Sequence, residues 1–315
     1  MKNEYELINH HKVNNIKAFV IDINYRRPHL HTDLEIIYIL EGSLTVKLEQ
    51  QIIQVEKGNF FVLNTCQLHE FISPDTAQLL IIQFNTKSIE NLFPEINEIL
   101  FENEPFHYSV SPTLLQIFLT LSHSYFNEDV LFHLSCQGYA ILTLYELLKV
   151  VPYTKITNSE RDNLLSRNER IARVSQYINR HYTEKILLSE LAEQENITTS
   201  YLSNFIKTHF GYTFQELVNF TRCEKAKYLL LNTKSNLLTI SQSCGYSDVR
   251  YLNKSFKTMF GMTPQQYRIH EREPEKNAEI NDLQSVDIQQ ILTKEQSIKK
   301  IEILFDSLGK RLLYI

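Results

Sequence analysis

The stretch YLSNFIKTHFGYTFQ, residues 201–215, recurs fifty residues later as YLNKSFKTMFGMTPQ, residues 251–265. Just upstream the offset becomes forty-nine, so that Leu191 pairs with Ile240. Two copies are too few for a solenoid, which needs about three repeats to bury a continuous core. Each copy instead predicts a short helix, a turn, and a second helix that ends at a glycine. This is the helix-turn-helix pattern, whose second helix enters the DNA major groove.

The charge distribution agrees with a nucleic-acid interface in the same segment. The whole chain of 315 residues has a net charge of −5. Residues 167–270 carry 14 Lys and Arg against 8 Asp and Glu, whereas residues 1–166 carry 11 against 20. A polyanion would therefore be attracted only by the segment that holds the repeat.

The spacing of apolar residues indicates which faces of the two second helices point outward. Gly245 falls in the turn of the second copy, where glycine most easily takes a positive φ, and we expect Ser247 to cap the helix that follows. Leu202 and Leu252 should face inward, together with Tyr201 and Tyr251. The predicted DNA-contacting residues are Ser200, Ser203, Asn204, Lys207, Arg222, Val249, Arg250, Asn253, Lys254 and Lys257. Amide and guanidinium groups suit base edges, and lysines suit phosphates.

Residues 168–270 resemble the DNA-binding domain of the AraC/XylS family of bacterial transcription regulators. The resemblance is carried by ISQSCGYSD (240–248), YL (251–252), FK (256–257) and FGMTPQQYR (260–268), and Arg222 matches the connecting helix of that family. It implies an all-α domain with two helix-turn-helix units that read successive major-groove segments. Ser241 and Leu252 depart from the usual pattern, which should weaken packing slightly.

In the N-terminal part of the chain, apolar residues recur at a different spacing. Leu44, Val46 and Leu48 alternate with polar residues, and further short apolar runs lie at 36–40, 52–53, 60–63 and 79–82. Many short strands with turns between them predict a β-sandwich or small barrel. Between residues 111 and 151 the period becomes helical, which predicts two amphipathic helices. They should either cover the sheet or form a dimer surface.

A histidine cluster is the second concentration of chemistry. His29 and His31 lie one residue apart, Glu35 follows four residues later, and His69 comes from a later segment. Three imidazoles and a carboxylate suit a divalent first-row metal. The arrangement resembles the cupin fold, in which these positions bind metal in the enzymes. We expect no metal cofactor here; the four residues should line an effector pocket at the mouth of the barrel.

These observations predict an α+β multidomain protein. Residues 1–151 form a cupin-like β-barrel or jelly roll with covering helices, 152–166 a linker, and 167–270 the DNA-binding domain. Residues 271–315 form a tail or the start of a further domain, and their apolar residues, such as Ile301 and Ile303, either dock elsewhere or belong to that further domain.

We expect a cytoplasmic, sequence-specific transcription regulator rather than an enzyme, since the chain has no signal segment, no apolar run long enough to span a membrane, and four scattered cysteines. Its expected partners are promoter DNA, a small-molecule effector, a second copy of the chain, and RNA polymerase if it activates transcription. The alternatives are a cupin metalloenzyme of the dioxygenase or isomerase type fused to a DNA-binding domain, or a regulator controlled by a protein partner through residues 271–315.

Overall fold

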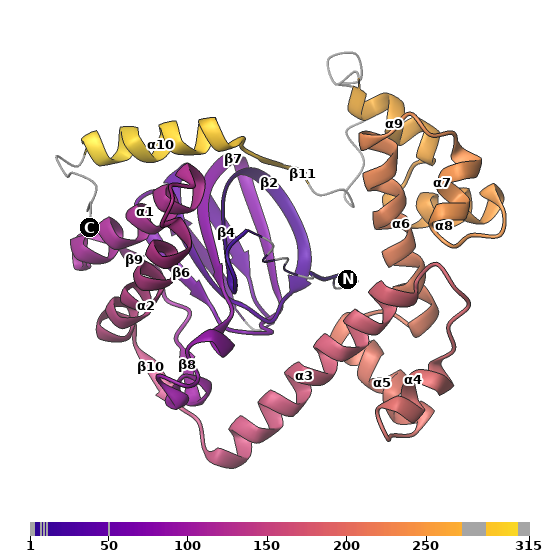
Figure 1. The fold of residues 1–315 in the computed structure, drawn as a ribbon, viewed down its shortest axis with the longest axis horizontal. Helices are drawn as coiled ribbons and strands as arrows, with labels where there is room; N and C mark the ends of the chain where they lie inside the picture. Colours follow the sequence, from indigo (N-terminus) through magenta and orange to yellow (C-terminus); the bar gives the residue numbers. More distant parts are fainter. Residues whose placement is uncertain are drawn as a thin grey trace. The chain divides into compact units, whose positions relative to one another are not determined.

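The computed structural model describes residues 4–6, 8, 10, 12–49, 51–272 and 288–307 (Figure 1). They divide into two compact units. The front unit contains residues 6–168 and 288–307, and the helical unit contains residues 169–272. A strand of two residues, β1 (Glu4–Tyr5), begins the described chain.

The front unit is built on a curled antiparallel sheet. Its main strands are β2 (Ile16–Leu30), β3 (Leu34–Glu41), β4 (Ser43–Lys47), β5 (Ile52–Glu56), β6 (Asn59–Leu63) and β7 (His69–Phe84). β7 pairs with β2 from Ile16↔Phe84 to His29↔His69. One half of β7 also pairs with β3, and its other half pairs with β4. The predicted apolar runs therefore lie in strands, and the β-rich front domain is confirmed.

Two clusters of buried apolar side chains pack on the two faces of this sheet. Residues such as Ile37 and Leu63 pack inside the curl, while Tyr38 and Phe60 pack against helices on the other side. Those helices are α1 (Pro112–Asn127) and α2 (Phe132–Val150), so the predicted pair of covering helices is confirmed. Smaller elements complete the unit, namely η1 (Thr86–Ser88), η2 (Pro94–Glu98), β8 (Ile99–Phe101), β9 (Phe106–His107) and η3 (Tyr108–Val110).

The predicted linker, residues 152–166, is largely regular structure. β10 (Tyr153–Lys155) pairs with β8, and α3 (Asn158–His181) begins three residues later. The Thr157 backbone and hydroxyl both donate to the Glu160 carboxylate, and the Glu160 backbone N–H donates back to the Thr157 hydroxyl. This is a capping box. The polar composition interpreted as a linker is thus a helix start, which corrects the prediction.

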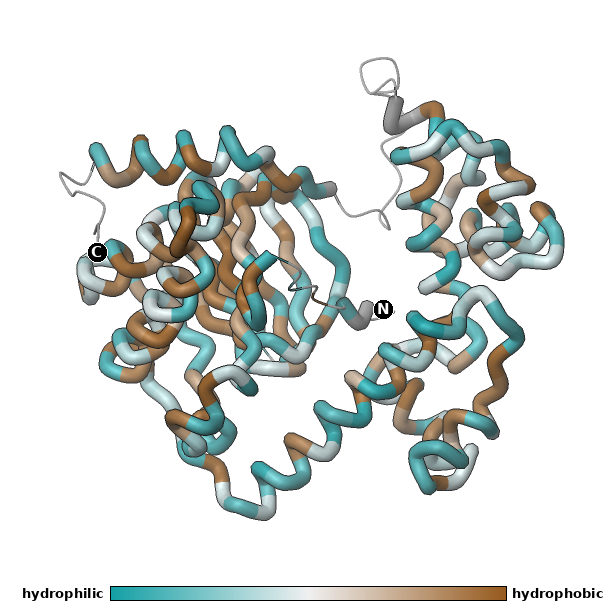
Figure 2. The backbone as a smooth tube through the Cα atoms, in the orientation of Figure 1, coloured by the Kyte–Doolittle hydropathy of each residue, from teal (hydrophilic) through white to brown (hydrophobic). Residues whose placement is uncertain are grey.

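The chain returns to the front unit after the helical unit. β11 (Ile288–Ile291) pairs antiparallel with β2, and the backbone N–H of Leu292 donates to the carbonyl of Val20 at 2.9 Å. α10 (Lys294–Ser307) packs on α1, where Ile301 is fully buried and Phe305 nearly so. Figure 2 shows α10 alternating between hydrophilic and hydrophobic residues. Of the two alternatives for this segment, docking on another part of the chain holds for residues 288–307, and residues 308–315 lie outside the described residues.

The helical unit repeats one motif around a central helix. Its elements after α3 are α4 (Leu188–Gln194), α5 (Thr199–Phe210), α6 (Phe214–Asn232), α7 (Leu237–Ser243), α8 (Val249–Phe260) and α9 (Pro264–Arg272). The α4–α5 pair lies on one side of α6 in the sequence, and the α7–α8 pair on the other. Cys223 and Ala226 of α6 share a core with Leu252 and Phe256 of α8. Among the described residues, no helix has the length and apolar composition that a membrane crossing requires.

Candidate DNA-binding face and candidate effector cavity

The fifty-residue repeat sets the boundaries of the helices in both pairs. α5 is followed by Gly211, and α8 by Gly261. Two residues after each glycine, Thr213 and Thr263 begin the next helix with the same bonds: each threonine hydroxyl accepts from a backbone N–H three residues later. The duplicated sequence therefore specifies a duplicated set of caps, which hold α5 and α8 at fixed lengths.

The turn between α7 and α8 requires glycine. Gly245 has φ +77°, and a Cβ at this position would lie 2.6 Å from Cα of Thr183. The counterpart in the first pair, at the offset of forty-nine, is Asn196, which also has a positive φ of 54°. Asparagine tolerates this conformation better than most residues. The segment around Thr183 thus packs directly against the turn of the second pair.

Most of the predicted DNA-contacting side chains lie in solvent. On α5, Ser200, Ser203, Asn204 and Lys207 are all exposed. On α8, Arg250, Lys254 and Lys257 are exposed, and Val249 and Asn253 are half-buried. Leu202 and Leu252 are fully buried on the opposite faces. Each helix therefore presents a polar face with cationic residues.

Tyr201 and Tyr251 lie on the outward faces, contrary to the prediction that they face the core. Their exposed fractions are 51% and 59%. Arg170 donates to the Tyr201 hydroxyl at 3.3 Å. Sequence reasoning treated both as core aromatics, although the recurrence of an amphipathic tyrosine at the start of both helices could have marked them as contact residues.

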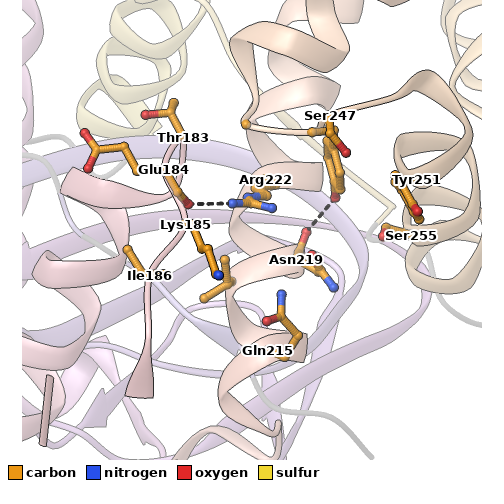
Figure 3. A pocket seen from close by; sticks show the side chains of 13 residues that line it. Thr183, Glu184, Lys185, Ile186, Gln215, Asn219, Arg222, Ser247, Tyr251 and Ser255 are labelled. Carbon is orange, nitrogen blue, oxygen red and sulfur yellow. Dashed lines mark hydrogen bonds between the residues drawn. The ribbon is translucent and has the colours of Figure 1, made fainter. Parts of the chain in front are cut away.

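Arg222, which the sequence predicts to contact DNA, donates hydrogen bonds to two backbone carbonyls of its own unit. Its Nε donates to the carbonyl of Tyr182 at 2.6 Å and its Nη2 to the carbonyl of Glu184 at 2.8 Å. Burial lowers the pKa of this guanidinium. Figure 3 shows Arg222 beside a cavity of about 550 Å³ in the helical unit, which is also lined by Lys185 and Tyr251. Arg222 thereby holds the segment that connects α3 to α4.

The start of α8 is capped by Asp248, one residue later than predicted. The Asp248 side chain accepts from the backbone N–H of Arg250 at 2.7 Å, and Ser247 remains exposed beside it. The Arg250 guanidinium also donates to Asp248, and these hydrogen bonds lower the pKa of the carboxyl. A carboxylate accepts this backbone donor more strongly than a hydroxyl does.

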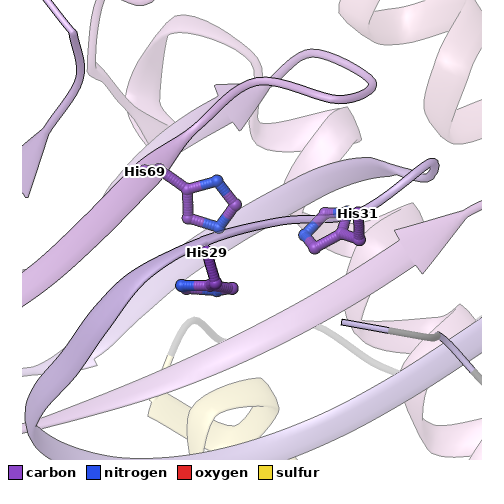
Figure 4. A group of neighbouring side chains, drawn as sticks. All are labelled: His29, His31 and His69. Carbon is purple, nitrogen blue, oxygen red and sulfur yellow. The ribbon is translucent and has the colours of Figure 1, made fainter. Parts of the chain in front are cut away.

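The histidine cavity is in the front unit. His29 of β2 pairs with His69 of β7 at the end of the region over which these two strands pair. His31 lies between β2 and β3. All three side chains and Glu35 are at most 3% exposed. The inward imidazole atoms lie within 4.8 Å of one another (Figure 4). The structure thus brings together all four residues that the sequence predicted to share a pocket, and two of them, His29 and Glu35, line a cavity of the front unit.

Backbone contacts orient the three imidazoles. Nδ1 of His29 lies 2.8 Å from the carbonyl oxygen of Arg27, Nδ1 of His31 3.1 Å from that of Asp33, and Nδ1 of His69 2.8 Å from that of Gln67. A carbonyl can only accept, so each Nδ1 carries a proton. In a neutral imidazole this leaves Nε2 as a lone-pair acceptor.

The cluster holds one buried ion pair and two neutral imidazoles. Nε2 of His31 lies 3.0 Å from Glu35, and although burial favours the neutral acid, His31 lowers the pKa of Glu35 to about 2. Burial lowers the pKa of His69 to about 4 and that of His29 well below its usual value. The cavity therefore offers acceptor atoms to a ligand, and these residue types also fit a divalent cation.

Two family models match the chain. An AraC-like ligand binding domain matches residues 20–139, which contain the three histidines and Glu35, and a helix-turn-helix domain matches residues 191–270, which contain most of α4 and all of α5, α7 and α8. Each match lies within one of the two units of the structure. The chain belongs to the AraC-type transcription regulators.

Similar proteins include transcriptional regulators of two bacteria. An uncharacterized HTH-type transcriptional regulator of Staphylococcus aureus is 27% identical over 241 residues, which is 75% of this chain but 31% of that protein. The chain thus spans about a third of that relative's length. The Msm operon regulatory protein of Streptococcus mutans is 24% identical, over 76% of this chain and 86% of that one. Among solved structures, the C-terminal domain of AraT, a response regulator from Geobacillus stearothermophilus, is 36% identical over 32% of this chain and 84% of that one, with a TM-score of 0.30.

Proposed function

We propose that this protein is a cytoplasmic, sequence-specific DNA-binding transcription regulator, controlled by a signal that the front unit senses. The observation that carries the proposal is the duplicated helix pair with two exposed polar faces, on α5 and α8. This part of the chain also carries the net positive charge, with 14 basic against 8 acidic residues over 167–270. A family match to a helix-turn-helix domain over the same residues supports it.

In this proposal α5 and α8 each enter a major-groove segment. Asn204, Arg250 and Asn253 contact base edges, because amides and guanidinium groups can read two base atoms at once. Lys207, Lys254 and Lys257 contact phosphates and fix the register. The exposed hydroxyls of Tyr201 and Tyr251 are further donors at the same faces.

The test is a salt titration of DNA binding by the full chain. Duplexes that the chain selects from a random pool should bind at least a thousandfold more tightly than competitor DNA at physiological salt, as is usual for specific proteins (roughly 10³–10⁷). Affinity should fall with salt in proportion to the phosphates contacted. Equal affinity for selected and scrambled duplexes would contradict the proposal.

The histidine cavity is the proposed effector site. His29, His31, Glu35 and His69 come together there, and Oε1 of Glu35 and Nε2 of His69 have no hydrogen-bond partner among the described residues, which leaves them open to a ligand. Effector binding would change promoter affinity by linkage between the two units. As an activator, the protein would also contact RNA polymerase. His69→Phe should abolish the response to effector while leaving basal DNA affinity unchanged, and an unaltered response would exclude this cavity.

A homodimer is proposed through α2. Leu134, Ile141, Leu142 and Tyr145 are exposed apolar residues on this helix, and Gly138 lies between them. No described atom lies within 4 Å of a Cβ built at Gly138. Glycine inside a helix costs about 1 kcal/mol relative to alanine, so its presence here suits the close approach of a second α2.

Sedimentation of Gly138→Leu tests the dimer. A branched side chain at the crossing point should convert the dimer to monomer while the fold persists. Val110→Leu, at an exposed position before α1, is the matched control and should leave the association state unchanged. A dimer of undiminished affinity in Gly138→Leu would exclude α2 as the interface.

The second candidate function is a metal-dependent enzyme activity of the front unit. The favouring observation is the orientation of the imidazoles, since hydrogen bonds from Nδ1 to backbone carbonyls also orient metal-binding histidines. Nε2 of the three histidines and Oε1 of Glu35 would hold the ion, which would supply Lewis acidity. Stoichiometric metal in purified protein that is lost in His29→Ala and His31→Ala would favour this candidate, and metal-free protein with unchanged effector response would exclude it.

A further inference from the structure

A carboxylate of the chain itself lies between two cations at the edge of the histidine cavity. Oε1 of Glu6 is 3.5 Å from Nζ of Lys17, and Oε2 of Glu6 is 3.3 Å from Nη2 of Arg26. Both cations come from β2, so the sheet fixes their separation. Glu6 comes from outside the main strands and is attached to β2 by a backbone hydrogen bond to the carbonyl of Leu30.

The cavity behind Glu6 is lined by polar and apolar residues from several strands. Its floor includes His29, Glu35 and Gln83, and its apolar wall includes Phe19 and Phe71. β11 closes another side with Gln289 and Ile291. The open volume is about 60 Å³, against roughly 300–1,000 Å³ for typical ligand sites. A ligand of more than a few atoms therefore needs the space that Glu6 or β11 occupies.

Two acceptor atoms on this floor have no partner. Glu35 and Gln83 are each 1% exposed, and among the described residues no donor reaches Oε1 of either side chain. A buried acceptor left unpaired costs about 1–3 kcal/mol. A ligand that brought a hydroxyl or amino donor to this floor would recover that cost.

We propose that Lys17 and Arg26 form the carboxylate-binding subsite of the effector cavity, which Glu6 occupies when no ligand is present. The ligand is a small organic acid that also carries a hydrogen-bond donor. Its carboxylate replaces that of Glu6 between the two cations, and its donor contacts Glu35 or Gln83. This assignment rests on the proposed function of the cavity as the effector site, and it makes Glu6 a built-in competitor of the effector.

The ligand class follows from the groups that face the cavity. The site between Lys17 and Arg26 already holds a carboxylate, so its geometry suits that group, whereas a neutral ligand would not replace the negative charge of Glu6 there. The unpaired atoms on the floor are acceptors, which favours a donor over a second acidic group. The resident carboxylate also explains why so little volume is open: the side chain of Glu6 fills the place of the ligand's anion.

Rescue of Glu6→Ala by acetate tests the subsite without knowledge of the effector. The variant removes the carboxylate that lies between Lys17 and Arg26 and so vacates the carboxylate-binding subsite. At neutral pH and constant ionic strength, about 100 mM acetate in place of chloride should raise the Tm of Glu6→Ala by about 2–4 °C. Acetamide, the neutral analogue, should not. Wild type should respond less, because Glu6 competes.

Two variants control for general effects of acetate. Glu41→Ala removes the acid from an exposed pair, Lys57 Nζ to Glu41 Oε2 at 2.8 Å, in the same unit. It should show no rescue, because its cation lies in open solvent. Glu6→Ala combined with Lys17→Met should lose the rescue. If Glu6→Ala does not fold, Glu6→Ser, which also removes the carboxylate and frees most of its volume, should give the same specific response.

The outcomes separate this inference from the proposed function. Equal responses of Glu6→Ala, Glu41→Ala and wild type would overturn the subsite, even in a protein that binds its operator. Glycolate should raise the Tm of Glu6→Ala more than methoxyacetate, which lacks the hydroxyl donor, and equal shifts would overturn the donor requirement. DNA binding is not measured in this assay, so failure of the DNA-binding proposal does not affect its result.

Discussion

The guanidinium of Arg250 donates a hydrogen bond to Asp248, the residue that caps the start of α8: Nη2 lies 2.9 Å from Oδ2. The side chain of Arg250 is nevertheless 87% exposed. Asp248 thus preorganises Arg250 at the outer edge of the first turn of α8, the part of a recognition helix that meets base edges. The contact restricts the long side chain before DNA arrives, which reduces the entropy lost on binding.

Arg250→Ala and Lys257→Ala should therefore affect DNA binding differently. Loss of a base contact at Arg250 should cost about 1–3 kcal/mol on the selected sequence and relax specificity at one position. Loss of a phosphate contact at Lys257 should weaken binding to all sequences similarly and reduce the salt slope by about one. Titrations on selected and scrambled duplexes distinguish the two, and identical behaviour would contradict the assigned roles.

Gly245→Ala should destabilise the helical unit. The added Cβ would meet the backbone of Thr183 at 2.6 Å, and the residue would have to keep a φ of +77°. Strain of this kind costs about 1–3 kcal/mol. Ser203→Ala, at an exposed position of α5, is the control and should change stability by less than about 0.5 kcal/mol in the same thermal unfolding assay. Unchanged stability of Gly245→Ala would show that the turn can relax.

Glu195 should make the stability of the helical unit depend on pH. Its carboxylate accepts from Nε of Arg173 at 2.7 Å and from Nε of Arg170 at 3.3 Å, and the hydrogen bond from Arg173 is the main cause of its lowered pKa. Because the folded pKa lies below the unfolded value of about 4.3, the stabilisation is present above that value and is lost as pH falls through the folded pKa.

Glu195→Gln should therefore cost about 1–3 kcal/mol at pH 7. The difference from wild type should shrink below about pH 4, where the wild-type carboxylate becomes protonated. Denaturant unfolding at several pH values measures this difference. A difference in the free energy of unfolding that stayed constant across the acid range would mean that the charge of Glu195 contributes nothing to stability.

The return of the chain to the front unit should contribute measurably to its stability. Ile301 is fully buried between α10 and α1, so Ile301→Ala should cost about 2–5 kcal/mol. Ile303 lies on the same helix and is 55% exposed, so Ile303→Ala should change stability by less than about 0.5 kcal/mol. Hydrogen exchange should also show faster exchange of β11 in Ile301→Ala alone. Equal effects of the two substitutions would mean that α10 is not docked in solution.

The sequence predicted local structure best where one signal repeated. Leu202 and Leu252 recur at the same helical position, and both are fully buried. The four residues of the histidine cluster were also predicted together, since two histidines one residue apart in an extended segment project to the same side. These are short-range patterns, in which spacing along the chain determines which side chains share a face.

Long-range contacts accounted for the errors. Arg222 has the sequence context of a DNA-facing cation, but its partners are carbonyls about forty residues away, which no local pattern reveals. Tyr201 and Tyr251 have the periodicity of core residues, yet their exposed fractions are 51% and 59%. The docking of β11 on β2 joins residues more than 260 positions apart, such as Gln290 and Asp22. Backbone pairing over such a separation depends on the tertiary fold rather than on composition.

Selection of bound duplexes from a random pool, at stated salt, tests the central claim most directly. Two recognition helices supplied by a duplicated motif should enrich two conserved blocks, with centres about one helical turn apart (roughly 34 Å). Arg250→Ala should relax specificity at one position of one block and leave the other block unchanged. A pool without enriched sequence, or one with a single block that Arg250→Ala leaves intact, would contradict the account.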